Sequence, residues 1–209
     1  MTKLLYIEAS PRKERSSSIQ VAKVFLDEWK RLHAGDEVVT LDLWKTDMPP
    51  FDGEIIEAKY AILHGKKPTP EQAKAWRVIE EFIREFKSAD KYVFSVPMWN
   101  YSIPYKLTHY LNIIVQPTYT FNAKADGSYE GLVVGKKALL VYARGGDYSP
   151  GSGADALDMQ SKYMDLVLGF IGFKDIQSIM VEPTIAPKEI KEKALQKAMD
   201  QAKRAAVDF

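Results

Sequence analysis

The amino-acid sequence predicts a doubly wound α/β fold, in which helices cover both faces of one five-stranded parallel sheet. One observation is that five apolar segments alternate with segments whose apolar residues recur at helical spacing, the pattern of successive βαβ units. Another is the run from Ala138 to Ala143, which has no polar break and suits a strand buried on both faces. A third is length, since 209 residues can form one large α/β domain, residues 1–209, with a sizeable core.

Five strands and about five helices favour the strand order 2-1-3-4-5 of flavodoxin-like folds. The predicted strands are an N-terminal run at residues 4–7 and the segments Glu37–Leu43, Lys91–Val96, Lys137–Ala143 and Asp175–Val181. In this order a ligand binds at the carboxyl ends of strands 1, 3 and 4, beside the point where the strand order reverses. The loops that follow these three strands are therefore expected to hold the functional site.

Helical periodicity predicts the elements between the strands. Apolar residues recur at helical spacing over residues 19–32, 76–86, 107–114 and 164–171, and a last helix is expected from near Pro187 to about Ala205. The second of these helices has a clear start, with Thr69 as N-cap, Pro70 at the first position and Gln72 completing a capping box. Gly172 is expected to cap the fourth.

Two insertions interrupt the alternation of strands and helices. Residues 49–68 form a long connection with a short helix expected around residues 54–63. Residues 119–133 are predicted to form a β-hairpin that turns at Asp126-Gly127. We interpret this hairpin as a lid or an interface element, because it is added at the functional edge of the sheet.

Composition excludes several classes of function. The net charge of +1 creates no field that favours nucleic acid or an acidic membrane, and the absence of cysteine excludes disulfides, thiolate catalysis and cysteine metal sites. His33, His64 and His109 share no metal-ligand spacing, so no metal site is expected. No signal peptide is visible, and no apolar run approaches the roughly 18 residues of a membrane span. A cytoplasmic enzyme is the expectation.

The loop after the first strand is rich in hydroxyl groups. It contains Ser10, Arg12, Ser16, Ser17 and Ser18, and it leads directly into a helix. Free N–H groups and the positive end of the helix dipole make such a junction a site for phosphate. Neither GxGxxG nor a P-loop occurs, so a monophosphate such as that of FMN suits the loop better than a dinucleotide. Simple N-capping by Ser16 or Ser17 is an equally weighted alternative.

The loop after the third strand contains large apolar side chains and an amide. Its candidate residues are Pro97, Met98, Trp99, Asn100 and Tyr101. A flat aromatic ring, an amide and peptide N–H groups can line a planar heterocycle and bind its polar edge. Core packing is the alternative for each residue taken singly.

The loop after the fourth strand contains a glycine pair. Its candidate residues are Ala143, Arg144, Gly145, Gly146 and Tyr148. Without a Cβ, the glycine backbone can approach a flat ligand closely, although an ordinary turn is the alternative. Together the three loops offer a phosphate cradle, an aromatic shelf and a glycine floor, a combination that fits FMN.

These motifs, together with Glu130-Gly131-Leu132, Gly135-Lys136-Lys137 and Gly169-Phe170-Ile171-Gly172, resemble those of the FMN-dependent NADH-azoreductases. The similarity extends over nearly the whole chain, and members of this family also act as NADH:quinone oxidoreductases. The resemblance implies a flavodoxin-like fold, one FMN per subunit and a homodimer with the flavin near the interface. It also implies that the four serines hold the phosphate, while residues 98–101 and 143–146 hold the isoalloxazine ring.

The expected activity is therefore hydride transfer from NADH, through flavin N5, to quinones and aromatic azo compounds by a ping-pong mechanism. The cofactor supplies the chemistry, so no side chain is assigned a catalytic role. Candidates for the acceptor pocket are the aromatic residues Tyr119, Phe121, Tyr148, Phe170 and Phe173. A flavodoxin-type single-electron carrier and a flavin-free phosphate-binding or hydrolytic protein are the alternatives. Near-neutral charge and the hairpin count against the carrier, and the aromatic loop counts against the flavin-free protein.

Overall fold

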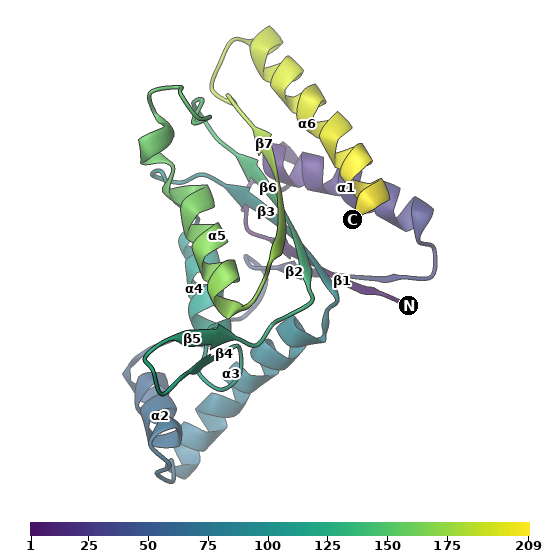
Figure 1. The fold of residues 1–209 in the computed structure, drawn as a ribbon. Coiled ribbons are helices and arrows are strands. Elements are labelled where there is room, and N and C mark those ends of the chain that lie inside the picture. The colour runs from purple at the N-terminus through teal and green to yellow at the C-terminus, as the bar shows by residue number, and fades with distance from the viewer.

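The computed structural model describes residues 1–209, and five of its strands form one parallel sheet (Figure 1). These strands are β1 (Lys3–Glu8), β2 (Glu37–Asp42), β3 (Lys91–Pro97), β6 (Lys137–Ala143) and β7 (Asp175–Val181). Their order is β2-β1-β3-β6-β7, which confirms the predicted order 2-1-3-4-5. The predicted boundaries of all five strands agree with the observed ones to within one residue.

Strand β6 lies inside the sheet and pairs with β3 and β7 along all of its residues. Residues 138–142 of this strand are completely buried. Both of its faces contact apolar layers, because Leu140 belongs to one core cluster and Leu139 to the other. This double burial explains the unbroken apolar sequence of the strand.

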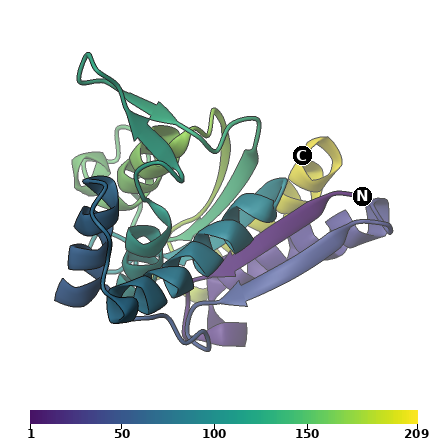
Figure 2. The same ribbon diagram turned by 90° about the horizontal axis from the view of Figure 1, so that it is seen from below.

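Helices cover the two faces of the sheet unequally. One face is covered by α1 (Ser17–Leu32) and α6 (Lys188–Asp208), and the other by α3 (Pro70–Ser88), α4 (Tyr105–Ile114) and α5 (Met159–Ile171). Figure 2 shows α1 and α3 on opposite sides of β1. The α1–α6 face has a cluster of 16 buried apolar residues, against 30 on the other face, so it has the smaller apolar core. Helix α2 (Gly53–Leu63) packs outside the layers, against α3.

The predicted N-cap of α3 and the predicted C-cap of α5 are both present in the structure. Thr69 Oγ1 accepts a hydrogen bond from Gln72 N (3.2 Å), and Gln72 Oε1 accepts one from Thr69 N (3.0 Å), which completes the capping box. Gly172 ends α5 with a φ of 118°, a conformation that residues with a Cβ rarely adopt.

The predicted hairpin consists of β4 (Phe121–Ala123) and β5 (Tyr129–Gly131), and it projects beyond the main sheet (Figure 2). It turns through Gly127, whose φ is 83°. The base of the hairpin packs on the end of α5: Val133 N donates to Ile171 O (2.8 Å). A Cβ placed on Gly131 would lie 2.3 Å from Gly172 N, so only glycine permits this close backbone contact.

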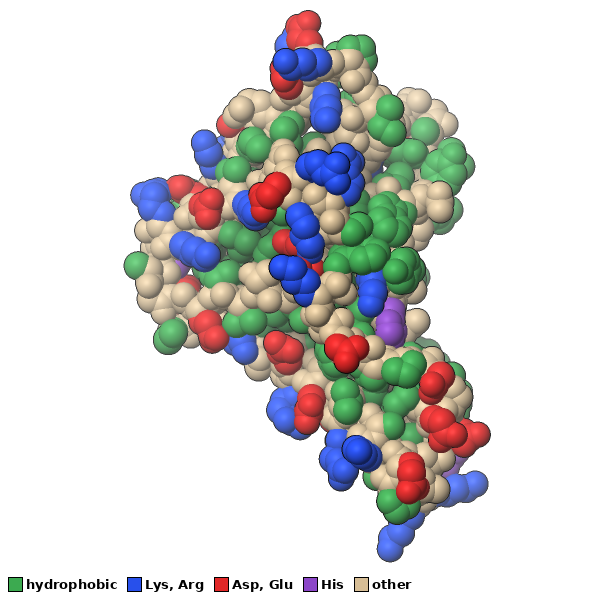
Figure 3. All heavy atoms as spheres, turned by 180° about the vertical axis from the view of Figure 1, so that it is seen from behind, with side chains coloured by type: hydrophobic (Ala, Val, Ile, Leu, Met, Phe, Trp, Pro, Cys, Tyr) green, Lys and Arg blue, Asp and Glu red, His purple; other side chains and the backbone are tan.

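The surface carries charges of both signs. Figure 3 shows lysines and arginines interspersed with aspartates and glutamates, including on the projection formed by the ends of α2 and α3. None of the helices combines the length and apolar character needed to cross a membrane.

Candidate functional site

A cavity of about 460 Å³ lies where the carboxyl ends of the parallel strands meet. It brings together candidate residues from all three predicted loops: Ser10, Arg12, Ser16, Ser17, Pro97, Met98, Trp99, Ala143 and Gly145. Residues that sequence analysis did not single out complete the lining: Arg15, Thr184, Ile185, Ala186 and Lys191. The last four follow β7, whose carboxyl end lies at the same edge of the sheet. That topology is the signal from which they could have been found.

The serine loop leaves the first turn of α1 without a side-chain cap. Ser16 occupies the N-cap position, but its side chain makes no hydrogen bond to the helix amides. Ser16 Oγ instead lies 3.1 Å from Ser18 Oγ, and both residues are buried. The N-capping alternative therefore does not describe this loop. The uncapped N–H groups and the Ser10, Ser16 and Ser17 hydroxyls form an anion-binding site.

Three positively charged side chains lie around this anion-binding site. Arg12, Arg15 and Lys191 line the cavity, and none forms an ion pair with another residue. Lys13 is different: its Nζ lies 2.7 Å from Glu8 Oε1 and 2.5 Å from Asp42 Oδ1. Burial lowers the pKa of Lys13, but the hydrogen bonds to Asp42 and Glu8 outweigh it and the pKa is raised. No acidic residue lines the cavity, so it favours a doubly charged phosphate.

The loop after β3 makes a tight turn at residues 99–102. Trp99 and Ser102 exchange backbone hydrogen bonds of 2.9 Å, and the two central residues, Asn100 and Tyr101, have φ values of 48° and 67°. Two consecutive residues in this region give the pattern of a type I′ turn, and a tyrosine there carries backbone strain. The amides of Asn100 and Tyr101 donate to no group of the protein, so they are free to bind a ligand.

In the loop after β6, the glycine backbone faces the cavity and the arginine side chain points away from it. Gly145 lines the cavity, and the Gly145 and Gly146 amides donate to no protein group. A Cβ on Gly145 would lie 3.0 Å from Ile185 Cδ1, so this close approach favours glycine. The Arg144 guanidinium turns away from the cavity and is only 2 % exposed. Its side chain therefore does not reach the cavity, although Arg144 was predicted as a cofactor-binding residue.

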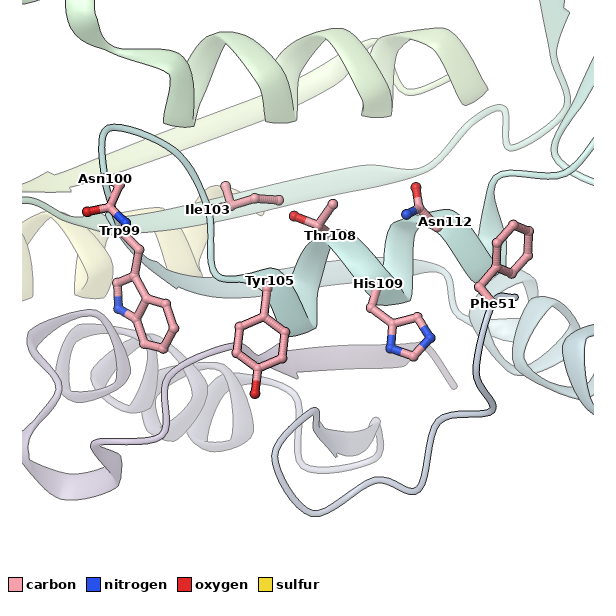
Figure 4. A pocket seen from close by; sticks show the side chains of 8 residues that line it. All are labelled: Phe51, Trp99, Asn100, Ile103, Tyr105, Thr108, His109 and Asn112. Atoms are coloured by element: carbon pink, nitrogen blue, oxygen red, sulfur yellow. The ribbon is translucent and has the colours of Figure 1, made fainter. Parts of the chain in front are cut away.

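A second cavity of about 500 Å³ opens beside the first, and Trp99 lines both. Its other lining residues are Phe51, Asn100, Ile103, Tyr105, Thr108, His109 and Asn112 (Figure 4). Trp99, Tyr105 and His109 extend toward the same side of α4. Trp44, which sequence analysis missed, lies against this aromatic wall, with ring centroids 5.8 Å from Trp99 and 5.5 Å from Tyr105. Its indole N–H donates to Ala9 O (3.0 Å).

The aromatic candidates for the acceptor pocket lie apart from these two cavities. Tyr119 packs on α3, where its hydroxyl donates to Glu80 Oε1 (2.5 Å). Phe173 is buried against Phe86 and Tyr92. Phe121 and Phe170 lie together at the hairpin, with their ring centroids 4.6 Å apart. Tyr148 lies next to the glycine loop, with its ring centroid 6.3 Å from that of Tyr101. No group of His, Asp or Glu side chains is placed to hold a metal ion.

The first cavity fits the parts of FMN. Its uncapped helix, hydroxyls and cations suit the phosphate, and Met98 and Trp99 offer apolar surface for a flat ring. The free amide of Gly145 lies at its wall and matches the polar edge of such a ring, and the free amides of residues 100, 101 and 146 belong to the same two loops. Six of the predicted cofactor-binding residues do not line this cavity: Ser18, Asn100, Tyr101, Arg144, Gly146 and Tyr148.

Comparison with known proteins identifies the family. A family model described as a flavodoxin-like fold matches residues 2–206. An FMN-dependent NADH:quinone oxidoreductase of Desulfotalea psychrophila is 47% identical over 202 residues, covering 97% of this chain and 95% of that protein. The chain belongs to the FMN-dependent NADH:quinone oxidoreductase family. A member of the family from Nitratidesulfovibrio vulgaris is 43% identical over the full length of both proteins.

Solved structures support the same assignment to this family. The crystal structure of an azoreductase from Bacillus anthracis superimposes with a TM-score of 0.92 at 32% identity, covering 100% of both chains. An FMN-dependent NADH-azoreductase from Bacillus anthracis, solved in complex with FMN, has a TM-score of 0.86 at 29% identity. It covers 99% of this chain and 100% of its own. The resemblance inferred from the loop motifs is thereby confirmed.

Proposed function

We propose that this protein oxidises NADH and reduces quinones and aromatic azo compounds, with FMN held in the 460 Å³ cavity. The observation that carries the proposal is that one cavity joins an uncapped helix N-terminus, an aromatic shelf and a glycine loop with free amides. The names of the relatives support it, since they include quinone oxidoreductases and azoreductases. The whole chain, residues 1–209, is proposed to act as a single FMN-binding domain.

The phosphate side of the site is assigned to the serine loop. Ser10, Ser16 and Ser17 donate hydroxyl groups, and the N-terminus of α1 adds backbone amides. Arg12 and Lys191 lie on the cavity wall, where they balance the phosphate charge.

The ring side of the site is assigned to the two other loops. When bound, FMN takes up two electrons from NADH and passes them to the acceptor. The chain holds the ring between Met98–Trp99 and Gly145, and the free amides of the turns bind its polar edge. Such donors stabilise the negative charge of a reduced ring, in the manner of an oxyanion hole.

The second cavity is proposed as the place of the acceptor. It shares Trp99 with the first cavity, and Phe51 and Tyr105 give it a wall for flat aromatic compounds. Because NADH and the acceptor both have to reach the same face of the ring, they bind in turn, which makes the kinetics ping-pong.

A cytoplasmic homodimer is proposed as the working form. Support comes from large apolar side chains left exposed near the second cavity, among them Tyr101 at 49% and Tyr105 at 61%. Phe121 and Phe170 pack on each other and on Tyr129 at the hairpin, and we propose that this aromatic group lies at the subunit interface, beside the acceptor. The absence of cysteine agrees with a reducing compartment.

The test is the visible spectrum of the purified protein under anaerobic conditions, before and after NADH and then after one equivalent of a quinone. We expect bound flavin that bleaches in one two-electron step and recovers its colour with the quinone. Flavin that stays yellow with NADH would indicate an electron carrier, and a colourless protein that binds no added FMN would refute the proposal. Replacing the quinone by an azo dye tests the second acceptor class.

A further inference from the structure

We propose that the N-terminus of α5 is a clamp that sets the spacing between the two ring-binding loops. Arg144 and Gln160 act in it as positioning residues, without contact to the ligand. This inference rests on the proposed function, because it is the flavin that these loops are assigned to hold. The clamp consists of Arg144, Asp158, Met159, Gln160 and Glu182.

The glycine loop is attached to the clamp through Arg144. Its Nη2 donates to Asp158 Oδ2 (2.8 Å), its Nε donates to Gln160 Oε1 (3.0 Å), and its Nη1 lies 3.5 Å from Glu182 Oε2. The backbone of the same residue is held too, because Arg144 N donates to Val181 O (3.0 Å) and its carbonyl accepts from Thr184 N (2.8 Å). Gly145, the next residue, is thereby placed at the cavity wall.

The aromatic loop is attached to the same helix turn. Gln160 Nε2 donates to Val96 O (3.0 Å) near the end of β3, and Met159 N donates to Tyr101 O (3.0 Å) at the tip of the turn. Asp158 in turn caps α5 through Gln160 N and Ser161 N. One helix terminus therefore holds the base and the tip of one loop and the arginine of the other.

Burial argues that this polar cluster has a purpose beyond stability. Gln160 is completely buried, Arg144 is 2 % exposed and Asp158 is 6 % exposed. A buried ion pair is often no more stabilising than apolar residues of the same volume, and its advantage lies in fixed geometry. None of these side chains lines the 460 Å³ cavity, so contact with FMN held there does not explain them, although Arg144, Asp158 and Glu182 border a separate cavity of about 420 Å³. Fixing the two loops relative to each other does explain them.

The test compares two clamp variants with a control. Arg144→Lys keeps the charge but cannot reproduce the forked contacts of a guanidinium, and Gln160→Met removes both bonds that join the loops. Lys91→Met is the matched control, since Lys91 is a partly buried cation at the opposite end of β3, where its Nζ donates to Phe209 O and lies 4.4 Å from the Trp29 ring. All three variants are expected to lose stability.

Two readouts separate positioning from stability. The first is the dissociation constant for FMN, measured by quenching of FMN fluorescence. We expect it to rise about tenfold in both clamp variants and to stay at the wild-type value in Lys91→Met. The second is hydrogen exchange in the apoprotein at Met98 N and Ile185 N, which donate to Ala143 O and Gly145 O. We expect both amides to lose protection in the clamp variants alone.

Two outcomes would refute the proposal that this cluster positions the loops. Unchanged FMN affinity and unchanged exchange at these amides would do so, as would changes in all three variants in proportion to their loss of melting temperature. If Arg144→Lys does not fold, Gln160→Met decides the question. A wild-type protein that binds no FMN refutes the proposed function instead, while the exchange measurement on the apoprotein still decides whether the clamp exists.

Discussion

Replacing Gly131 by alanine should destabilise the protein through one backbone contact. The new Cβ would lie 2.3 Å from Gly172 N and 2.4 Å from Ile171 C, whereas ordinary contacts begin near 3.4 Å. The hairpin would have to move away from α5 by about 1 Å, although Val133 N is bonded to Ile171 O. Overpacking typically costs about 1–3 kcal/mol, and the upper value applies here because neither partner is a flexible side chain.

Thermal and urea denaturation measure this effect. For a chain of this length, about 3 kcal/mol corresponds to a fall of about 6–12 °C in melting temperature. The control is Gly169→Ala in α5, where a Cβ meets no atom within 4 Å and alanine favours the helix by about 1 kcal/mol. A Gly131→Ala protein that melts at the wild-type temperature, or that loses no more stability than Gly169→Ala does, would refute the reasoning.

Three further results are expected. Gly145→Val pushes Ile185 aside and fills the cavity wall, so the protein should purify folded but without flavin, and normal flavin occupancy would contradict the placement of the glycine floor. Lys191→Ala should weaken FMN binding about two- to fivefold, less so at high salt, whereas Lys188→Ala, which does not line the cavity, should leave binding unchanged. Burial raises the pKa of Asp158, but hydrogen bonds from Ser161 and the charge of Arg144 outweigh it and lower the pKa. The free energy of unfolding lost in Asp158→Asn should therefore have its full value above about pH 4 and vanish as the pH falls further, because the native carboxylate is then protonated. Urea denaturation at several pH values measures this loss, and a loss that does not vary with pH would contradict the prediction.

The fold could be predicted because its signals are local. Apolar runs set the strands, the Thr69–Gln72 box set the start of α3, and Asp126-Gly127 set the hairpin turn. The three loops could be predicted as well, because the carboxyl ends of parallel strands meet at one edge of the sheet.

The directions of individual side chains could not be predicted. Arg144 follows a buried strand in a loop that lines the cavity, yet its guanidinium turns inward to carboxylates that lie 14 and 38 residues further along the chain. Phe173 follows the cap of α5 and enters the core beside Tyr92, a contact that depends on the packing of β3. Lys191 reaches the cavity only because α6 begins at the same edge as α1, which periodicity within α6 does not reveal.

The smaller apolar core on the α1–α6 face couples ligand binding to local unfolding. The fully buried residues of α6 are three alanines, Ala198, Ala202 and Ala206, with Leu195 and Met199 partly buried and Phe209, after the helix, packed against Phe25 and Trp29. Of the helices that cover the sheet, we expect α6 to detach at least cost. Its first turn nevertheless shares a cavity wall with the serine loop that precedes α1. A cofactor that bridges the two binds only the docked form, and by mass action it holds α6 in place. Release of the flavin should therefore increase the exposure of this helix to proteolysis.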